Sequence, residues 1–437
     1  METRIKSVLK CIRCGDETEL YGAKNFTCHC GGLYDVCHYG LNLNRSILRD
    51  FDERAAMNSS STLSQSGVWR FHELVMPSLS VSDIVSLGEG IMPFWQAGNN
   101  LREWVGGDLD LWIMPEGLTP TGSFKDFGGT VAISVAKKSG VKAIICASTG
   151  DTSAMAAAYA AKAGIACAVV LPKGKITDVQ MAQPIAHGAR VILIPGNFDA
   201  CMKIVGELVA AERASPINSI NPARIEGHQA TVFLANQFFG WQMPDVFVVP
   251  VGNGSNSSSV GKGMRLMLDN GLAGKLAKLI GVQSEAANPL ASSWELVQTN
   301  GSVAGAGVWS KVYKKKTDLG DTTATAALIG NPVSYEKVMR EIVASRGAVL
   351  TAAEQDLNKA VLVAGSDGHF VCPQTGTALA GLRQSVQRGL VKRGQRVVVI
   401  STATGLKFPH VPVLYGKNLV TEARTCETGE VADIIGV

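Results

Sequence analysis

The sequence lacks the features that mark membrane, secreted and nucleic-acid-binding proteins. No stretch reaches the roughly 18 uninterrupted apolar residues of a membrane-spanning helix. The first ten residues are charged at Glu2, Arg4, Lys6 and Lys10, and they have neither the apolar core nor the cleavage site of a secretory signal. The formal net charge is only +4, with acids interspersed among the bases. We therefore expect a cytoplasmic protein that binds neither membranes nor nucleic acid.

Internal repeats are also absent, which excludes solenoid architectures. The 437 residues are too many for one ordinary core, and 46% of them are hydrophobic while 18% are charged. With 47 glycines, this composition is typical of a globular α/β enzyme with more than one domain.

Cysteine is not scarce, but its distribution argues against disulfides. Six of the ten cysteines are dispersed along a chain that we expect to be intracellular, where thiols stay reduced. The other four cluster as Cys11-x2-Cys14 and Cys28-x-Cys30, with glycines at the turns. Four thiolates suit a tetrahedral zinc ion, so this cluster predicts a zinc ribbon. Because the second pair has one intervening residue instead of two, a ribbon that has lost its metal is the alternative.

From Leu111 onward, short apolar runs alternate with helical patterns, which predicts βαβ units on parallel sheets. The predicted strands are 143–147, 166–171, 190–194, 246–251, 279–283 and 396–400, and the predicted helices are 154–162, 179–186 and 200–211. In doubly wound α/β folds, ligands bind at the carboxyl ends of the strands. Functional side chains are therefore expected in the loops that follow the strands.

One lysine lies in a segment suited to covalent chemistry. Lys125 stands among small residues, an aromatic residue and glycines, just before a helical pattern. A partly desolvated lysine near a helix start has a lowered pKa and can form a Schiff base with a carbonyl cofactor. The alternative is an ordinary solvated lysine after a turn.

Four loops offer groups that bind anions. Residues 148–153 combine hydroxyls with the free amides of a helix start, or they form a plain capping turn. Residues 252–257 are glycine-rich and suit one phosphate group, because they fit neither the Walker nor the dinucleotide spacing. Residues 218–227 add an amide, a hydroxyl and Arg224 for a second anion, or they form a surface turn. Residues 401–408 bring hydroxyls to the same sheet edge, or they are a plain loop.

Taken in order, these segments resemble the threonine synthases, which are fold-type II pyridoxal-phosphate (PLP) enzymes, and especially the plant-type branch. The match also includes 67–70, 88–90 and 370–373 and covers roughly four-fifths of the chain. It implies a tryptophan synthase β-like α/β fold of two doubly wound parallel-sheet lobes behind a small N-terminal cysteine ribbon. The implied domains are a zinc-ribbon-like segment (1–40), an arm with the start of the large PLP lobe (41–110), the Schiff-base lysine segment with the small lobe (111–240), and the remainder of the large lobe (241–437).

The resemblance also implies roles for individual residues. Lys125 would be the catalytic residue and would hold PLP covalently, while the hydroxyl of Thr402 would meet the pyridine nitrogen. The implied cofactor-binding residues are Phe124, Lys125, Asp151, Gly252, Asn253, Gly254, Ser255, Asn256 and Thr402. Ser148, Thr149 and Thr152 would bind the substrate carboxylate. Asn218, Ser219 and Arg224 would bind its phosphate.

The implied reaction converts O-phospho-L-homoserine and water to L-threonine and phosphate, catalysed by a homodimeric carbon–oxygen lyase. The sequence departs from the family at Thr404, where histidine is usual, and at Asp151, where several relatives carry asparagine. A cysteine ribbon is unlike the plant branch but occurs in prokaryotic threonine synthases and in cysteate synthase. Cysteate synthase, which uses O-phospho-L-serine and sulfite, and a catalytically silent PLP-fold binding protein are therefore the alternatives. Activation by S-adenosylmethionine, as in plant-type relatives, is left open.

Overall fold

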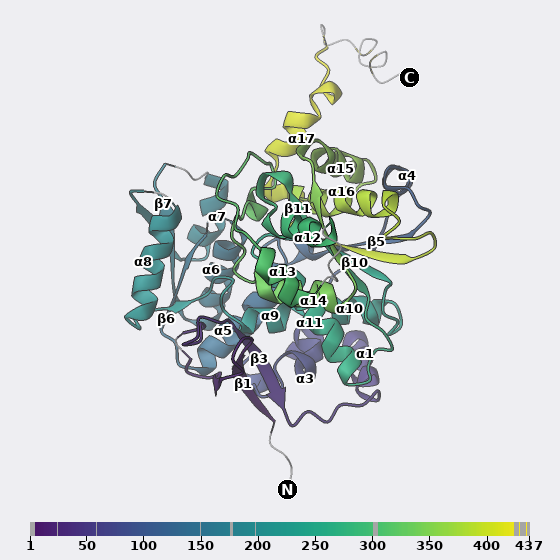
Figure 1. The fold of residues 1–437 in the computed structure, drawn as a ribbon. Helices are drawn as coiled ribbons and strands as arrows, with labels where there is room; N and C mark the ends of the chain where they lie inside the picture. Colours follow the sequence, from purple (N-terminus) through teal and green to yellow (C-terminus); the bar gives the residue numbers. More distant parts are fainter. Residues whose placement is uncertain are drawn as a thin grey trace.

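Three sheets organise the chain in a computed structural model (Figure 1). The structure describes residues 5–423 except 24, 58, 149, 175–177, 197 and 300–304, together with 428 and 434. A six-stranded sheet and a four-stranded sheet carry the α/β body, and a three-stranded sheet near the N-terminus forms the cysteine ribbon. The two-sheet parallel architecture expected from the sequence is confirmed.

The six-stranded sheet has the order β12-β11-β10-β13-β5-β4 and is parallel except at β4. Its strands are β4 (Trp95–Gln96), β5 (Asp110–Pro115), β10 (Val246–Pro250), β11 (Lys278–Ser284), β12 (Ala348–Ala352) and β13 (Arg396–Ser401). β10 is buried along its whole length, as its β-branched residues predict.

The six-stranded sheet is covered by helices on both faces. Side chains alternate along a strand, so neighbouring residues of β10 contact helices on opposite faces. Phe247 and Val249 belong to one core cluster, together with Met264 of α11, whereas Val248 belongs to a second cluster with Leu379 of α16. The helices over the first face are α10 (Ala230–Phe238), α11 (Ser255–Asp269) and α14 (Tyr335–Ala344). Those over the second are α4 (Asn99–Val105), α15 (Glu354–Ser366) and α16 (Pro373–Gln387).

The four-stranded sheet has the order β8-β7-β6-β9, with all pairs parallel. Its strands are β6 (Ala143–Ala147), β7 (Ala166–Pro172), β8 (Arg190–Ile194) and β9 (Ser215–Pro216). Its helices are α5 (Lys125–Lys138), α6 (Asp151–Ala163), α7 (Asp178–Ala186) and α8 (Phe198–Ala210). Cys201 and Val205 of α8 contact one face through Ile145, while Met155 and Tyr159 of α6 lie in the core cluster of the other face.

The ribbon consists of β1 (Lys6–Cys11), β2 (Glu17–Glu19) and β3 (Tyr34–Tyr39), all antiparallel. The N-terminal arm follows as α1 (Ile47–Ala56), α2 (Thr62–Gln65), η1 (Trp69–Phe71), α3 (His72–Val75) and η2 (Val81–Asp83). Trp69 and Phe71 are fully buried, and the Trp69 indole donates to Thr130 Oγ1 of α5 at 2.7 Å. Although much of its sequence is polar, this arm contributes large aromatic side chains to the core.

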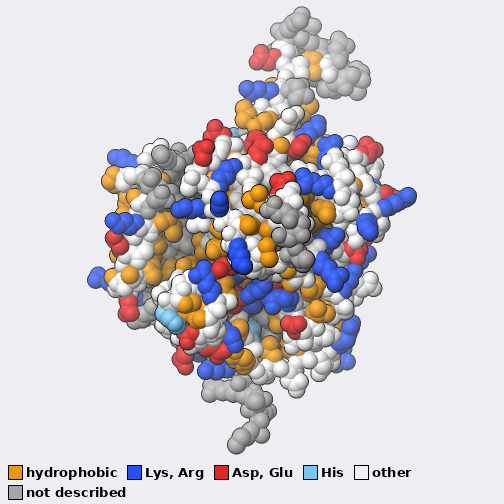
Figure 2. Space-filling view, viewed as in Figure 1, with side chains coloured by type: hydrophobic (Ala, Val, Ile, Leu, Met, Phe, Trp, Pro, Cys, Tyr) orange, Lys and Arg blue, Asp and Glu red, His pale blue; other side chains and the backbone are white. Residues whose placement is uncertain are grey.

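The remaining elements are η3 (Glu116–Leu118), α9 (Ala223–His228), η4 (Glu285–Ala287), α12 (Pro289–Thr299), α13 (Ala306–Val312), η5 (Thr325–Ala327), η6 (Gly405–Lys407), α17 (His410–Tyr415) and η7 (Lys417–Leu419). The chain leaves the body through α17, which projects at the top of Figure 1. Lys, Arg, Asp and Glu side chains are interspersed over the face drawn in Figure 2. Among the described residues, no helix combines the length and apolar character needed to cross a bilayer.

Candidate functional site

Lys125 is the first residue of α5. It lines a pocket formed by loops and helix ends of both parallel sheets. Its segment is anchored to the end of β13, because the Phe124 amide donates to the Thr402 carbonyl at 2.8 Å. The Lys125 ammonium lies 4.0 Å from the centre of the Phe124 ring. Desolvation, followed by the positive charge of Arg224, lowers the pKa of Lys125 to about 7. Near neutral pH this lysine is therefore available as an unprotonated nucleophile.

One pocket brings together the whole set of residues predicted to bind the cofactor. It is lined by Phe124, Lys125, Asp151, Gly252, Asn253, Gly254, Ser255, Asn256 and Thr402, together with Pro250, Ala326, Ala327 and Gln374. These residues come from α5, α6, the loop after β10, η5, α16 and the end of β13, which are distant in sequence. The pocket lies at the carboxyl ends of parallel strands, where ligands of doubly wound folds bind.

The loop after β10 has the form of a phosphate cradle. Gly254 precedes α11 with φ +86, a left-handed conformation that glycine adopts without strain, and no side chain caps the helix. The first amides of α11 are therefore free to donate to an anion. Both amide atoms of Asn256, at the same helix start, are buried without a partner among the described residues. The donors fit a single phosphate group, as on PLP.

One of the residues that line the pocket, Asp151, forms an ion pair. Lys407 Nζ, from η6, lies 2.8 Å from Asp151 Oδ1 at the start of α6, and both side chains are largely buried. Nearby, the Thr402 hydroxyl lies 3.6 Å from Cys372 Sγ. Sequence analysis had not singled out Lys407 or Gln374, although both belong to matched or adjacent segments. Ala326 and Ala327 carry no chemical signal that a sequence could reveal.

A second group of polar side chains lies at the carboxyl edge of the four-stranded sheet. Ser148 follows β6, while Asn218 and Ser219 follow the neighbouring strand β9, and Asn218 Nδ2 donates to the Ala147 carbonyl at 3.0 Å. Thr152 lies buried in the first turn of α6. The structure thus brings these predicted substrate-binding residues to one edge. Thr149 lies outside the described residues.

Arg224, on α9, is the most unusual member of this group. Its side chain is fully buried, yet the only hydrogen bond that this side chain makes among the described residues runs from Nη1 to the Ile217 carbonyl at 3.3 Å. Nε and Nη2 have no partner in the part of the chain that the structure describes. Desolvation lowers its pKa to about 10. A buried guanidinium with unused donors is costly unless an anion pairs with it, so this position fits a bound phosphate or carboxylate.

His228 also belongs to this region. Its ring lies 4.9 Å from that of Phe124, and neither ring nitrogen finds a partner within the described ranges. Burial and the positive charges of Arg224 and Lys125 hold its pKa well below the usual value, so the imidazole stays neutral. The sequence does not predict a role for His228, because nothing in its local pattern separates it from a core histidine.

The four clustered cysteines come together at one end of the ribbon. All four Sγ atoms lie within 4.8 Å of one another, with Cys11 and Cys30 3.5 Å apart and Cys14 and Cys28 3.6 Å apart. The irregular Cys28-x-Cys30 spacing does not prevent this clustering. Gly31 adopts φ +78, and its amide donates to the Cys28 carbonyl at 2.8 Å, which closes a tight turn. The distances are far longer than a disulfide bond.

Comparisons with known proteins agree with this geometry. A sequence profile of the family described as "Pyridoxal-phosphate dependent enzyme" matches residues 85–403. Threonine synthase of Methanocaldococcus jannaschii is 35% identical over 415 residues, 92% of this chain and 94% of that protein. Threonine synthase 2, chloroplastic, of Arabidopsis thaliana is 36% identical over 401 residues, 90% of this chain and 75% of that protein.

The chain belongs to the threonine synthase family. Its fold is shared with the crystal structure of threonine synthase from Escherichia coli, with a TM-score of 0.68, 17% identity and coverage of 98% of this chain and 94% of the other. As a member of the threonine synthases within the PLP-dependent enzymes, it is an enzyme, and a silent binding protein is not favoured. The names of these relatives also do not favour the cysteate synthase alternative.

The structure shows a local role for Thr404, the position at which the sequence predicts a departure from the family. The Thr404 side chain accepts a hydrogen bond from the Leu406 amide at 3.3 Å, so it caps the short helix η6. The Thr404 amide donates to the Gly122 carbonyl at 3.1 Å, beside the Lys125 segment. Threonine therefore maintains the turn that carries Lys407, whichever residue stands here in relatives.

Proposed function

We propose that this protein converts O-phospho-L-homoserine and water to L-threonine and inorganic phosphate, with PLP bound at Lys125. The observation that carries the proposal is Arg224, a buried guanidinium with two nitrogens that have no partner among the described residues, separate from the phosphate cradle at α11. A PLP enzyme whose substrate lacks phosphate needs only the cradle for its cofactor. A second anion site near Lys125 supports a substrate that carries its own phosphate.

The pocket residues fit the cofactor by their chemistry. The backbone amides of 252–256 and the start of α11 would hold its phosphate, Thr402 would meet the pyridine nitrogen, and Asp151 would face the ring oxygen. When bound, PLP supplies an electron sink conjugated to the substrate's Cα. A hydroxyl partner at the pyridine nitrogen limits this electron sink, which favours elimination and replacement chemistry over transamination.

The chain's own residues account for substrate orientation and proton movement. Ser148, Thr149 and Thr152 would hold the substrate carboxylate, and Asn218, Ser219 and Arg224 would hold its phosphate, so the amino acid would span the pocket past Lys125. With its pKa lowered to about 7, Lys125 can both take and return a proton near neutral pH. We propose that Lys125 moves protons at Cα and Cβ, that phosphate departs from Cγ, that Cγ gains a proton to become the methyl group, and that water adds at Cβ.

Product identity tests this proposal directly. Purified holoenzyme is incubated with O-phospho-L-homoserine alone and, in parallel, with O-phospho-L-serine and sulfite. We expect L-threonine and phosphate in equal amounts from the first mixture. Lys125→Ala should abolish turnover. Arg224→Met should lower kcat/KM by at least about tenfold, because the substrate loses charged hydrogen bonds. The Arg224→Met enzyme should retain the visible absorbance of the bound cofactor. Cysteate from the second mixture, with no threonine from the first, would overturn the assignment.

We further propose that Cys11, Cys14, Cys28 and Cys30 bind one structural zinc ion. A tetrahedral zinc site with Zn–S bonds of about 2.3 Å places its sulfur atoms about 3.8 Å apart. The separations of 3.5 Å and 3.6 Å between paired thiols support such a site. We expect one zinc per chain by elemental analysis and less than half of that in Cys14→Ser. Cys167→Ser, a half-buried cysteine outside the ribbon, is the control; equal zinc in both variants would refute the site.

We also propose a cytoplasmic homodimer built from four segments: a zinc-ribbon-like segment (1–40), an arm with the start of the large PLP lobe (41–110), the lysine segment with the small lobe (111–240) and the rest of the large lobe (241–437). The dispersed cysteines, free in the described part of the chain, support a reducing compartment. Because one relative is named chloroplastic, cell fractionation is the appropriate test of location.

A further inference from the structure

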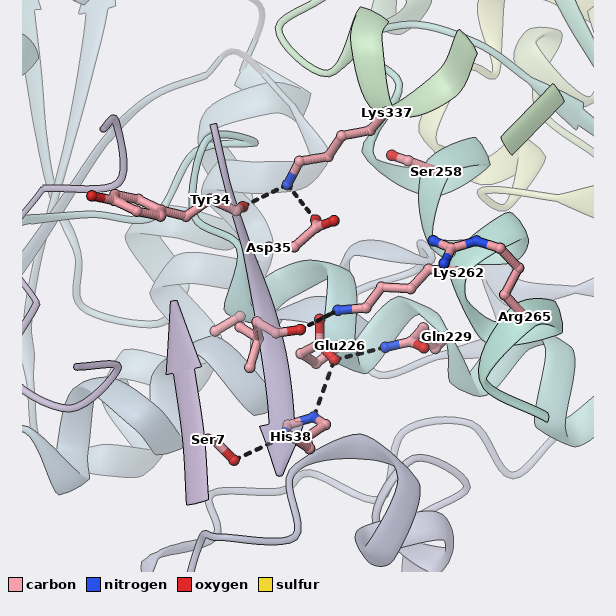
Figure 3. A network of polar contacts seen from close by, with 12 residues as sticks. Ser7, Tyr34, Asp35, His38, Glu226, Gln229, Ser258, Lys262, Arg265 and Lys337 are labelled. Atoms are coloured by element: carbon pink, nitrogen blue, oxygen red, sulfur yellow. Dashed lines mark hydrogen bonds and ion pairs between the residues drawn. The ribbon is translucent and has the colours of Figure 1, made fainter. Parts of the chain in front are cut away.

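A buried network of charges joins the ribbon to the body of the enzyme, and Glu226 of α9 is at its centre (Figure 3). The Glu226 side chain is 0% exposed. It pairs with Lys262 of α11, accepts from Gln229 Nε2 at 2.8 Å, and lies 3.3 Å from His38 Nε2 of the ribbon strand β3. Groups from the ribbon and from two helices of the body therefore meet at one carboxylate.

Hydrogen bonds within and next to the ribbon fix the orientation of the His38 ring. Ser78 donates to Ser7 Oγ at 2.6 Å, so Ser7 uses its own hydrogen toward His38 Nδ1, 2.7 Å away. Nδ1 of His38 then accepts, so the ring hydrogen is on Nε2, the nitrogen that lies 3.3 Å from Glu226 Oε2. Lys262 adds a second link, because its ammonium also donates to the Val36 carbonyl of β3 at 2.7 Å.

A second set of charges holds the other end of β3. Asp35 lies 2.7 Å from Lys337 and 2.9 Å from Arg340, both on α14, and Lys337 also donates to the Tyr34 carbonyl at 2.6 Å. The Lys337 side chain is 2% exposed. Buried charges of this kind are costly to desolvate and add little net stability, so their value lies in fixing one arrangement.

The network fixes the positions of α9 and α11, two helices that contribute residues to the proposed anion sites. Successive residues of a helix are about 100° apart, so Arg224 and Glu226 lie about 200° apart and face opposite sides of α9. Glu226 faces the ribbon, so Arg224 is directed away from it. Lys262 belongs to α11, the helix whose first residues, Ser255 and Asn256, line the cofactor pocket. The ribbon therefore contacts both helices that carry the proposed anion sites.

We propose that His38 and Lys262 are positioning residues for the substrate phosphate: through Glu226 they set the orientation of α9 and hence of Arg224. This inference rests on the proposed role of Arg224. The cysteine ribbon is then part of the support of the active site, and its loss weakens substrate binding before it affects the cofactor, whose cradle is held by Gly252–Asn256 and Lys125.

The test compares His38→Leu with His38→Gln, which keeps a side-chain donor, and with Lys10→Gln, a control on the ribbon's exposed ion pair with Glu17. For His38→Leu we expect KM for O-phospho-L-homoserine to rise about tenfold, with kcat within about threefold and unchanged affinity for PLP. His38→Gln should restore most of the loss, and Lys10→Gln should match the unmodified enzyme. Lys262→Met removes the opposing charge and gives an independent second variant if His38→Leu does not fold.

Unchanged KM in a folded His38→Leu or Lys262→Met enzyme would overturn the inference, as would an equal loss of PLP affinity and substrate affinity. Binding of inorganic phosphate to the holoenzyme, measured by calorimetry, provides a readout that does not depend on turnover. If O-phospho-L-homoserine is not a substrate, the proposed function fails. Weaker phosphate binding by His38→Leu than by Lys10→Gln would still support the positioning role.

Discussion

At the scale of single residues, the chemistry of the site depends on one lysine made reactive by burial. Below a pH of about 7 the Lys125 ammonium is protonated and cannot attack a carbonyl. We expect covalent capture of PLP by the apoprotein, followed by visible absorbance, to quicken about tenfold per pH unit up to pH 7 and then level off. Lys137→Gln, an exposed position in the same helix, is the control. A rate that keeps rising toward pH 10 would contradict the lowered pKa.

Burial raises the pKa of the acid Glu116, whereas it lowers the pKa of Lys125. Glu116 is fully buried, its only described partner is the Thr231 hydroxyl, and desolvation raises its pKa to about 8. An acid whose pKa is raised by folding favours the fold when protonated, so its contribution is lost as pH rises toward 8.

Glu116→Gln removes this pH dependence while keeping an acceptor for Thr231. We expect the variant to gain stability over the parent as pH rises from about 4.5 to 8, reaching a few kcal/mol at the upper end. Denaturant unfolding at several pH values measures this difference. Glu103→Gln, on the surface, should follow the parent at every pH; a constant difference for Glu116→Gln would rule out the titration.

At the scale of elements, α5 and α9 are in close contact because glycine permits it. A Cβ added at Gly227 would lie 1.8 Å from the Phe127 carbonyl oxygen, which is backbone and cannot rotate away. These two helices carry Lys125 and Arg224. The contact between Gly227 and Phe127 therefore holds the proposed catalytic lysine at a fixed separation from the proposed phosphate-binding arginine, and a side chain at Gly227 would break this contact.

We therefore expect Gly227→Ala to destabilise the protein by roughly 1–3 kcal/mol or more, and to reduce PLP affinity by separating α5 from α9. Gly206→Ala, in the exposed interior of α8 with no atom within 4 Å of the new Cβ, is the matched control and should be neutral or stabilising by about 0.5–1 kcal/mol. Thermal unfolding and a cofactor titration measure both effects. Equal stability of the two variants would show that the helices can separate without cost.

At the scale of the whole molecule, the segment that begins with α17 and includes η7 exposes apolar side chains. Val413, Leu419 and Val420 are 67%, 80% and 74% exposed on the segment that projects from the body in Figure 1. Apolar side chains gathered on a projecting segment are typical of a contact surface. They support the proposed homodimer, with this segment covering a second copy.

Replacing Leu419 and Val420 by aspartate would place charges at that contact. We expect the dimer dissociation constant to increase by at least about tenfold, equivalent to about 1.4 kcal/mol, in sedimentation velocity experiments. Val81→Asp, at a 46% exposed position away from this segment, controls for added charge and should leave association unchanged. An unaltered dissociation constant in the double variant would exclude this segment from the interface.

The sequence by itself predicted six of the parallel strands and the chemistry of the loops that follow them, but not β5 or β12. β6 begins and ends where its apolar run predicts, because buried parallel strands need continuous β-branched or apolar residues. The bounds of β8 also match its apolar run, although β8 is an edge strand with no fully buried residue. The residues expected to bind the cofactor line one pocket, because the carboxyl ends of parallel strands converge. Local pattern suffices for these features.

Only the tertiary structure decided which groups are left without partners and which distant segments support them. The sequence identifies Arg224 as a candidate but cannot show that two of its nitrogens lack a partner in the described part of the chain, since that depends on every neighbour. Likewise, Lys407 pairs with Asp151 and His38 meets Glu226 across intervals that no local periodicity encodes. Burial, ion pairing and pKa arise from atoms brought together by folding, and so these properties of the site belong to the fold.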